Sequence, residues 1–405
     1  MVQISQLKLP VDHSPGALNE KIRKILNLKK EEKFTYQILK RSIDGRKKPD
    51  LYYVYSLAVE TGAEKRILKR PPAGVLAYQP RLYQFPERGS KPLKNPPAII
   101  GAGPAGLFAA LLLTELGYCP RIFERGAAIE QRKTAVEAFW KIGLLDPATN
   151  VQFGEGGAGA FSDGKLNTAV KDPAGRNRFV LETFVRFGAP SSILYDNKPH
   201  IGTDVLARVI YNMRSYLEEK GARFFFGTLV TDLRIEGGRV TGLICGDREY
   251  AADAVILAIG HSARDTMHKL YDRGLPMEAK AFAVGFRVEH PQKMMDLAMY
   301  GRERGCLPAA PYKVTSNFPG GRGVYSFCMC PGGYVVNSSS EAGRLAVNGM
   351  SYSGRSGDNA NSAIIVSVKP EEFGGQGPLA GIAWQRKLEE QAFALCTGKE
   401  ITVLL

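Results

Sequence analysis

The sequence lacks any apolar run long enough to cross a bilayer, which takes about 20 consecutive apolar residues. Its opening residues, MVQISQLKLPVDH, also lack the basic start and the following apolar block of a secretory signal. These two absences argue against a membrane-spanning or exported protein. They predict a cytoplasmic chain that has no membrane partner.

Cysteine and histidine are scarce, with six Cys and five His among 405 residues. The cysteines show no repeated spacing of the kind that structural zinc sites use, and Cys328 and Cys330 form CxC rather than CxxC. We expect ordinary reduced thiols and no metal site, with a redox role for some of the cysteines as the alternative. The sequence also has no HxxxH, no GxSxG and no carboxylate cluster, so metal-dependent hydrolysis and serine-type acyl transfer have no support.

Acidic residues are outnumbered, because 54 Lys and Arg face 40 Asp and Glu, which leaves a net charge of +14. Much of the excess lies in the first fifty residues, and the segment KRILKR continues it. A solvated basic face is the simplest interpretation of this charge. A surface that meets RNA or the phosphates of a cofactor is the alternative.

The pattern of apolar residues, glycines and prolines predicts an α/β chain in four segments. Residues 1–60 indicate a basic α+β module, and residues 61–95 a Pro-rich connector. Residues 96–272 alternate short apolar strands with helices, which is typical of a Rossmann-like domain. Residues 273–405 change to short strands and turns, which predicts a sheet-rich second domain inserted into the first.

The strongest motif is Gly101-x-Gly103-x-x-Gly106, which follows an apolar strand at 98–100 and opens a helix. The first glycine permits a tight turn, the second lets the backbone approach a pyrophosphate, and the third allows the helix to pack on the strand. Free N–H groups at the helix N-terminus bind phosphates in such sites. The motif in this context predicts dinucleotide binding.

An acidic residue stands where a dinucleotide fold needs one. Glu124 lies near the end of the next strand, close to the spacing of about 20 residues expected for a carboxylate that binds a ribose hydroxyl. The motif alone fits FAD or NAD, and the Glu124 carboxylate disfavours a 2′-phosphate beside it. The predicted site also includes Pro104, Ala105 and Arg125.

A second strand that ends in glycine lies at 254–260 (AVILAIG) and is followed by His261 and Ser262. It resembles the second signature of flavoproteins with two dinucleotide folds, where the chain passes close to the flavin nucleotide. Gly260 would give the bend, and Ser262 or the backbone beyond it a polar contact. A buried strand with a turn is the alternative. The cofactor-contacting candidates here are Gly260, His261 and, on a strand predicted at 223–235, Val230.

Further motifs are spread in order along nearly the whole chain: ILKRSIDGRKK, GAGPAGLFAAL, FGEGGAGAFSDGKLNT, PHIGTD, AIGHSARDT, FAVGFRVEHPQ, YSFCMCPGG and NGMSYSGRSGDNANSA. With them the chain resembles the uncharacterised FAD-dependent dehydrogenases of bacteria. More distantly it is similar to the glutathione-reductase-type flavoproteins. The resemblance implies FAD as the cofactor.

The same resemblance implies that residues 154–165 form a loop that runs over the flavin. Glycines in this loop would let backbone N–H groups face the flavin ring or the pyrophosphate without side chains in the way. Lys165 is a candidate cation for stabilising the reduced, anionic flavin, and a solvated Lys165 after a turn is the alternative. The loop residues expected to contact the cofactor are Gly156, Gly157, Gly159, Ser162, Asp163 and Lys165.

Three more side chains are candidates with competing interpretations. Arg132 falls where related flavoproteins place a basic residue near the nucleotide, and a surface charge on a helix fits equally well. His261 and His290 are weak candidates, as is Lys165, for a catalytic role, His261 and His290 as proton donors. Structural or solvated roles are the simpler interpretation for both histidines.

The resemblance does not extend to a closing segment. Related flavoproteins return to the first domain through a late strand with a Gly-Asp motif and a helix, and we do not find that motif. The last expected element is a helix at 383–395, followed by TGKEITVLL. We expect a chain that lacks this segment, with weak flavin binding and low stability, and a site closed in another way is the alternative.

Together these features predict an FAD-dependent oxidoreductase. It would take hydride at flavin N5 from a reduced donor, for which NAD(P)H is the candidate, and deliver it to an unknown small-molecule acceptor. No second GxGxxG with an acidic partner is present, so a nicotinamide would visit the flavin transiently. The alternatives are a flavin-dependent RNA-modifying or RNA-binding protein that uses the basic module, and an inactive remnant.

Overall fold

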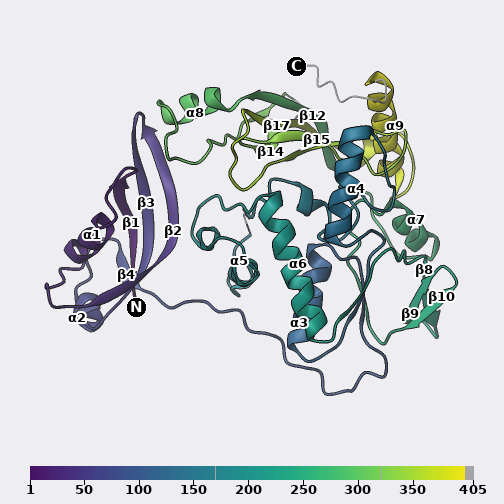
Figure 1. Ribbon diagram of the computed structural model, residues 1–405, viewed down its shortest axis with the longest axis horizontal. Coiled ribbons are helices and arrows are strands. Elements are labelled where there is room, and N and C mark those ends of the chain that lie inside the picture. The colour runs from purple at the N-terminus through teal and green to yellow at the C-terminus, as the bar shows by residue number, and fades with distance from the viewer. Residues whose placement is uncertain (169, 320, 397–405) are drawn as a thin grey trace. The chain divides into compact units, whose positions relative to one another are not determined.

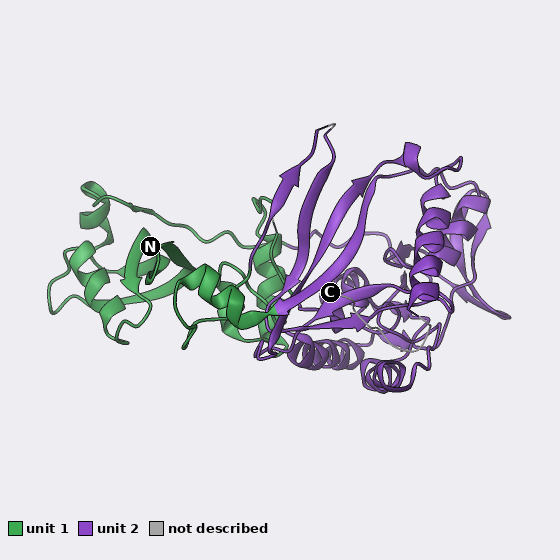
Figure 2. Cartoon of the chain, turned by 90° about the horizontal axis from the view of Figure 1, so that it is seen from above, with its two compact units in different colours: residues 1–84, 165–201, 291–311 green, residues 85–164, 202–290, 312–405 purple. Residues whose placement is uncertain are grey.

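The computed structural model describes residues 1–168, 170–319 and 321–396, so the expected final segment 397–405 lies outside the described residues. The chain forms two compact units, which Figure 2 shows in different colours. The first unit consists of Met1–Gln84, Lys165–Ile201 and Pro291–Pro311, and the second of Phe85–Gly164, Gly202–His290 and Tyr312–Leu405. Each unit therefore combines segments that are far apart in the sequence.

The first unit is built on a four-stranded sheet of order β2-β3-β1-β4 (Figure 1). Alternate residues of the first strand turn Val2 and Ile4 inward, where they pack with Leu57 and with Ile22 of a helix. The elements of residues 1–60 follow in the order strand, helix, strand, strand, which agrees with the α+β composition predicted for them. The elements of this unit are β1 Val2–Pro10, α1 Ala17–Ile25, β2 Phe34–Lys47, β3 Asp50–Thr61, α2 Glu64–Lys69, β4 Val75–Ala77, α5 Arg176–Arg186, η2 Ser191–Leu194 and α8 Gln292–Tyr300.

The second unit contains a parallel sheet of order β11-β5-β6-β7. Its central residues are apolar and pair in register, Ile256 with Ile99, Ile99 with Ile122, and Ile122 with Phe224. Helix α3 is apolar on all sides and packs against this sheet and α6, so it forms a buried crossover. The elements are β5 Ala98–Ile100, α3 Pro104–Glu115, β6 Arg121–Phe123, α4 Ile129–Ile142, η1 Ala158–Phe161, α6 Thr203–Glu219, β7 Arg223–Phe225 and β11 Val255–Leu257.

The long strand predicted at 223–235 is wrong, because the chain breaks there into β7 and a separate strand β8. Gly227 adopts a φ of 61°, which ends the extended run, and the residues that follow turn toward the end of the parallel sheet. Gly237 and Gly238 form the turn of a hairpin, with φ of 56° and 74°. It joins β8 Asp232–Glu236 to β9 Arg239–Cys245, and β10 Arg248–Ala251 completes a three-stranded sheet.

A sheet-rich part completes the second unit. The sequence predicted short strands and turns for residues 273–405. Four strands form a sheet of order β12-β17-β14-β13, and β15 pairs with β16. In the described part of the chain, no helix is both long and apolar enough to span a membrane. The remaining elements of this unit are α7 Arg264–Asp272, β12 Phe282–Pro291, β13 Thr315–Asn317, β14 Gly323–Cys330, β15 Tyr334–Asn337, β16 Val347–Met350, β17 Asn359–Val368, η3 Pro370–Glu372 and α9 Ala380–Leu395.

Candidate functional site

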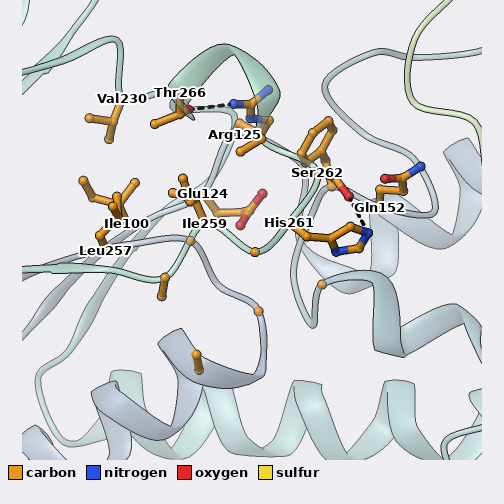
Figure 3. A pocket seen from close by; sticks show the side chains of 18 of the residues that line it. Ile100, Glu124, Arg125, Gln152, Val230, Leu257, Ile259, His261, Ser262 and Thr266 are labelled. Atoms are coloured by element: carbon orange, nitrogen blue, oxygen red, sulfur yellow. Dashed lines mark hydrogen bonds between the residues drawn. The ribbon is translucent and has the colours of Figure 1, made fainter. Parts of the chain in front are cut away.

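A cavity of about 720 Å³ lies in the second unit at the carboxyl ends of β5, β6 and β11. This is where open α/β sheets bind their ligands, and the volume lies in the range of about 300–1,000 Å³ that is typical of small-molecule sites. Apolar side chains such as Ile100, Val230 and Leu257 form one part of the wall. Figure 3 shows Glu124 among them, with His261, Ser262 and Gln152 gathered on one side.

Two glycines of the predicted motif, Gly101 and Gly103, line this cavity. Gly101 has a φ of 101°, and a Cβ there would collide with the carbonyl oxygen of Ala258, the residue that follows β11. Gly106 packs so closely on the turn that a Cβ would strike the Gly101 carbonyl oxygen, as expected of the third glycine. Gly103 is the N-cap of α3 and lines the cavity together with Pro104 and Ala105. The free N–H groups of the first helical turn therefore lie at the cavity.

Glu124 is buried at the end of β6, with 6% of its surface exposed. One carboxylate oxygen accepts a hydrogen bond from the Ala102 N–H at 2.8 Å, and the other accepts from the N–H groups of Gly126 and Gly154, both at 3.0 Å. A carboxylate offers about four acceptor positions, so one remains for a ligand hydroxyl. Glu124 thus joins the glycine motif to the 153–164 loop at the cavity wall.

The 153–164 loop contributes its first half to the cavity and its second half to packing. Gly154, Gly157 and Gly159 line the cavity. The other predicted loop glycine, Gly156, packs against α6, where a Cβ would meet the Ile210 side chain. The Ser162 hydroxyl donates to the Gly159 carbonyl at 2.8 Å and so tightens the loop on itself.

Asp163 and Lys165 do not line the cavity. Asp163 is 1% exposed, and its carboxylate pairs with Arg355 and accepts a hydrogen bond from the Ser351 hydroxyl. Lys165 belongs to the first unit, where it pairs with His200 in an isolated β-bridge. The buried ion pair of Asp163 therefore fixes the end of the loop.

Arg132 is fully buried in the second unit and does not line the cavity. Its guanidinium donates to the carbonyl oxygens of four residues in the segment before and within the glycine loop, and it lies over the Phe161 ring at 4.9 Å. Burial lowers its pKa to about 10, although the carboxylates of Glu124 and Glu155 oppose the shift. Arg132 thus fixes the backbone of residues 150–155 through hydrogen bonds from the protein interior.

Glu155, which we did not single out from the sequence, is a second buried carboxyl group of this loop. Its carboxylate accepts from the Ile129 N–H at the start of α4 at 2.8 Å and from Arg214 Nε at 3.0 Å. Burial raises its pKa to about 7, although these donors oppose the shift. In the sequence, the available signal for a buried Glu155 was its place between Gly154 and Gly156, because glycines mark closely packed backbone.

The bend after β11 brings His261 and Ser262 to the cavity, where Gly260 adopts a φ of 69°. Partial desolvation lowers the pKa of His261, although its side chain remains exposed, and the nearby Arg264 guanidinium lowers the pKa further. His290, at the end of β12, is not among the cavity-lining residues. Burial lowers the pKa of His290, with Glu289 opposing, and its Nε2 has no hydrogen-bond partner among the described residues.

Arg125 follows Glu124 and lines the cavity as well. It donates to the Asp265 carboxylate at 2.8 and 3.0 Å and to the Thr266 hydroxyl at 3.3 Å, and its guanidinium lies 4.3 Å from the Phe153 ring centre. Figure 3 shows its contact with Thr266. Arg125 therefore links β6 and the glycine loop to the first turn of α7 across the cavity.

Sequence reasoning missed Gln152 and Thr228, which also line the cavity. Gln152 stands just before the glycine-rich stretch, and Thr228 follows the glycine that breaks the predicted long strand. No group of three or more His, Cys, Asp or Glu is placed to hold a metal ion among the residues that the structure describes.

Three family models match the chain. Residues 204–327 match "FAD dependent oxidoreductase", residues 281–404 match "FAD-dependent protein, C-terminal domain-like", and residues 1–60 match a domain of unknown function. An uncharacterised protein of Clostridium beijerinckii is 43% identical over 401 residues, which are 98% of this chain and 75% of that protein.

Solved structures with matching segments have low sequence identity. Glycine oxidase from Bacillus cereus is 14% identical, with 76% of this chain and 80% of that chain covered and a TM-score of 0.30. THI4 of Thermovibrio ammonificans is 20% identical, with 46% of this chain and 64% of that chain covered and a TM-score of 0.30. The present chain thus spans less than two thirds of the THI4 chain.

Proposed function

This chain belongs to the same family as the uncharacterised Clostridium beijerinckii protein, and from that premise we propose that it is an FAD-dependent oxidoreductase with its cofactor in the cavity of the second unit. The observation that carries the proposal is the meeting of the α3 N-terminus, Glu124 and the glycine loop at one cavity. Two FAD-dependent family models that match residues 204–404 support it.

The residues present fit FAD. The α3 N-terminus offers backbone N–H groups to a pyrophosphate at Gly103, where no side chain blocks the approach. The free acceptor position of Glu124 suits a ribose hydroxyl, and the apolar side chains around Val230 and Leu257 suit an aromatic ring. When bound, FAD supplies a carrier that accepts a hydride and passes it on.

His261 is the protein group that we propose to handle a proton at this site. Its lowered pKa keeps the imidazole neutral at pH 7, so that one ring nitrogen can donate while the other accepts. The Ser262 hydroxyl lies 3.4 Å from His261 Nε2, on the same bend. The donor that we propose for the hydride is NADH or NADPH, and the acceptor is an unsaturated or carbonyl compound.

The test is anaerobic reduction of the full chain after it has been loaded with FAD. We expect NADH or NADPH to bleach the flavin absorbance near 450 nm, and we expect His261→Asn to retain FAD and to change the pH dependence of the reaction with an acceptor. A flavin-loaded chain that neither nicotinamide reduces would contradict the proposed donor and leave the proposed cofactor intact.

We propose nucleic-acid binding by the basic module as a second candidate function, on one observation. Exposed basic residues gather on α1, on α2 and on the loop after α1, and Arg66 ties that loop to α2 through Asn27 and Glu32. These residues are Lys21, Lys24, Lys29, Lys30, Lys33, Lys65, Lys69 and Arg70.

The test is RNA binding by the full chain across a salt series. We expect Lys29, Lys30 and Lys33 changed together to Glu to abolish binding. The matched control changes Lys133, Lys141 and Lys387, exposed lysines of other helices, to Glu and should leave binding intact. Equal losses would mean that only net charge matters, and that outcome would sink this candidate.

A further inference from the structure

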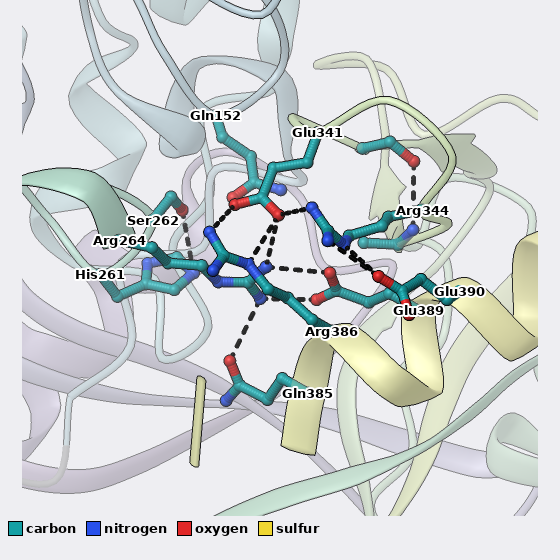
Figure 4. A network of polar contacts seen from close by, with 12 residues as sticks. Gln152, His261, Ser262, Arg264, Glu341, Arg344, Gln385, Arg386, Glu389 and Glu390 are labelled. Carbon is teal, nitrogen blue, oxygen red and sulfur yellow. Dashed lines mark hydrogen bonds and ion pairs between the residues drawn. The ribbon is translucent and has the colours of Figure 1, made fainter. Parts of the chain in front are cut away.

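The bend that carries His261 is anchored by a helix more than a hundred residues further along the chain. Arg264, the first residue of α7, follows the cavity-lining residues directly. Its guanidinium donates to both carboxylate oxygens of Glu389 on α9, at 2.9 and 2.6 Å, and to the Gln385 amide oxygen at 3.2 Å. Figure 4 shows Arg264 between His261 and these α9 side chains.

Arg264 is part of a larger network in which charges of both signs balance. Glu341, in the loop between β15 and β16, lies 3.5 Å from Arg264 and accepts two hydrogen bonds from Arg386 of α9, at 2.9 and 2.8 Å. Arg344 pairs with the same Glu341 and with Glu390 of α9 (Figure 4).

The contact between Arg264 and Glu389 is well shielded from water. The two side chains are 14% and 20% exposed, and both oxygens of the carboxylate are engaged. Two-point pairing of this kind fixes the orientation of a guanidinium, which a single exposed ion pair does not. The position of Arg264 is therefore set by α9.

The loop between β15 and β16 reaches the cavity by a second route. Gln152, a cavity-lining residue, donates to the Ser338 carbonyl, and the Trp140 indole N–H donates to the Asn337 carbonyl at 2.9 Å. The Leu345 N–H in turn donates to the Glu389 carbonyl at 2.9 Å. Glu389 thus lies where α9, this loop and the His261 bend converge.

We propose that Arg264 is a positioning residue for His261 and that Glu389 is its anchor, so that α9 controls one side of the cavity. This proposal rests on the proposed function in so far as His261 handles a proton there. Arg264 brings a positive charge toward the imidazole, and the carboxylates of Glu389 and Glu341 offset that charge.

The charged groups around His261 come from several elements. Arg264 and Asp265 lie at the start of α7, Glu124 and Arg125 line the same cavity, and Glu389, Glu341 and Arg386 lie behind Arg264. Gln152 and Ser262 are neutral. Changes on the two sides of the Arg264–Glu389 pair should therefore act on His261 with opposite sign.

The test compares two variants of the full chain by NMR titration of the imidazole of His261, assigned with His261→Asn. We expect Arg264→Gln to raise the pKa of His261, because it removes the opposing positive charge. We expect Glu389→Gln to lower it, because Arg264 is then less well neutralised. Both changes should weaken FAD binding about tenfold, since both release the bend.

Glu390→Gln is the matched control, because Glu390 is the next residue on α9 and pairs with Arg344 rather than with Arg264. We expect it to leave both the pKa of His261 and FAD affinity unchanged. The double variant Arg264→Glu with Glu389→Arg restores a pair of charges and should recover part of the FAD affinity.

Shifts of the same sign in Arg264→Gln and Glu389→Gln, or equal effects of Glu389→Gln and Glu390→Gln, would overturn the proposal, because loosening of α9 alone would then explain them. Failure of the unmodified chain to bind FAD would contradict the proposed function instead. The NMR titration needs no flavin and would still decide the role of Arg264.

Discussion

Gly103 and Gly16 are the same residue type at the same helix position, and they differ in what surrounds them. Gly103 is the N-cap of α3 with a φ of −73°, and Gly16 is the N-cap of α1 with a φ of −79°. An added Cβ would lie 3.8 Å from Gly157 Cα in the first case and in open space in the second. Both backbones accept alanine, so the two positions separate a ligand effect from a folding effect.

We predict that Gly103→Ala weakens FAD binding about tenfold, which is about 1.4 kcal/mol, while leaving the melting temperature of the flavin-free chain unchanged. The added methyl group keeps the pyrophosphate away from the α3 N-terminus. Gly16→Ala should change neither quantity. Flavin fluorescence titration measures the affinity, and equal Kd values for the two variants would show that Gly103 does not face the cofactor.

Titration of Glu155 makes the stability of the folded chain depend on pH. Burial raises its pKa to about 7 from an ordinary value of 4.5, so between these values the folded chain holds a proton that the unfolded chain has released. The stability contributed by this group is fully present below about pH 4.5 and is lost as the pH rises through about 7.

We predict that the free energy of unfolding of the natural chain falls between pH 5 and pH 8 relative to that of Glu155→Gln, by up to about 3 kcal/mol. The glutamine cannot ionise, so the stability of the Glu155→Gln variant does not depend on pH through this position. Urea unfolding at the two pH values measures the difference. Parallel curves for the two proteins would mean that Glu155 is charged throughout.

Among the structural elements, the end of the 153–164 loop is held by a buried ion pair. Asp163 and Arg355 are 1% and 9% exposed, and Arg355 Nε lies 3.2 Å from the carboxylate. Because half of this loop lines the cavity, the pair connects the packing of the sheet-rich part to the site. Removing one partner of a buried pair leaves an uncompensated charge.

We predict that Arg355→Met lowers the free energy of unfolding by about 3–5 kcal/mol. Lys293→Met is the control, because Lys293 and Glu303 form a pair whose side chains are 74% and 78% exposed, and it should produce no measurable change. Chemical denaturation of both variants measures the effect. A small loss for Arg355→Met would show that the loop end is held by its other contacts.

Elements with a local signal were predictable from the sequence, and those set by distant packing were not. The strand, turn and helix around Gly101 follow from apolar runs and glycine spacing, which also place Glu124. The inward turn of Arg132 depends on carbonyl oxygens of residues 150–155, and the path after Gly227 depends on hydrogen bonds of Gly227 and Thr228 to the segment 124–126, none of which is visible in the local sequence. A charged residue on a helix looks the same in sequence whether it faces water or carbonyl oxygens.

For the molecule as a whole, the predicted α/β class is confirmed, and the division of the chain is more interleaved than the sequence indicated. Residues 165–201 and 291–311 join the first unit although their neighbours in sequence belong to the second. Hydrophobic periodicity gives the type of an element and not the unit in which it packs. The Arg264–Glu389 pair was hidden for the same reason, since its partners are 125 residues apart.

The proposal that FAD binds in the cavity at the glycine motif can be tested directly. The most direct measurement is the absorption spectrum of the purified chain, before and after heat release of any bound molecule, with mass analysis of what is released. We predict a flavin spectrum and release of FAD at up to one molecule per chain, or uptake of added FAD to that level. A colourless chain that takes up no added FAD would contradict it.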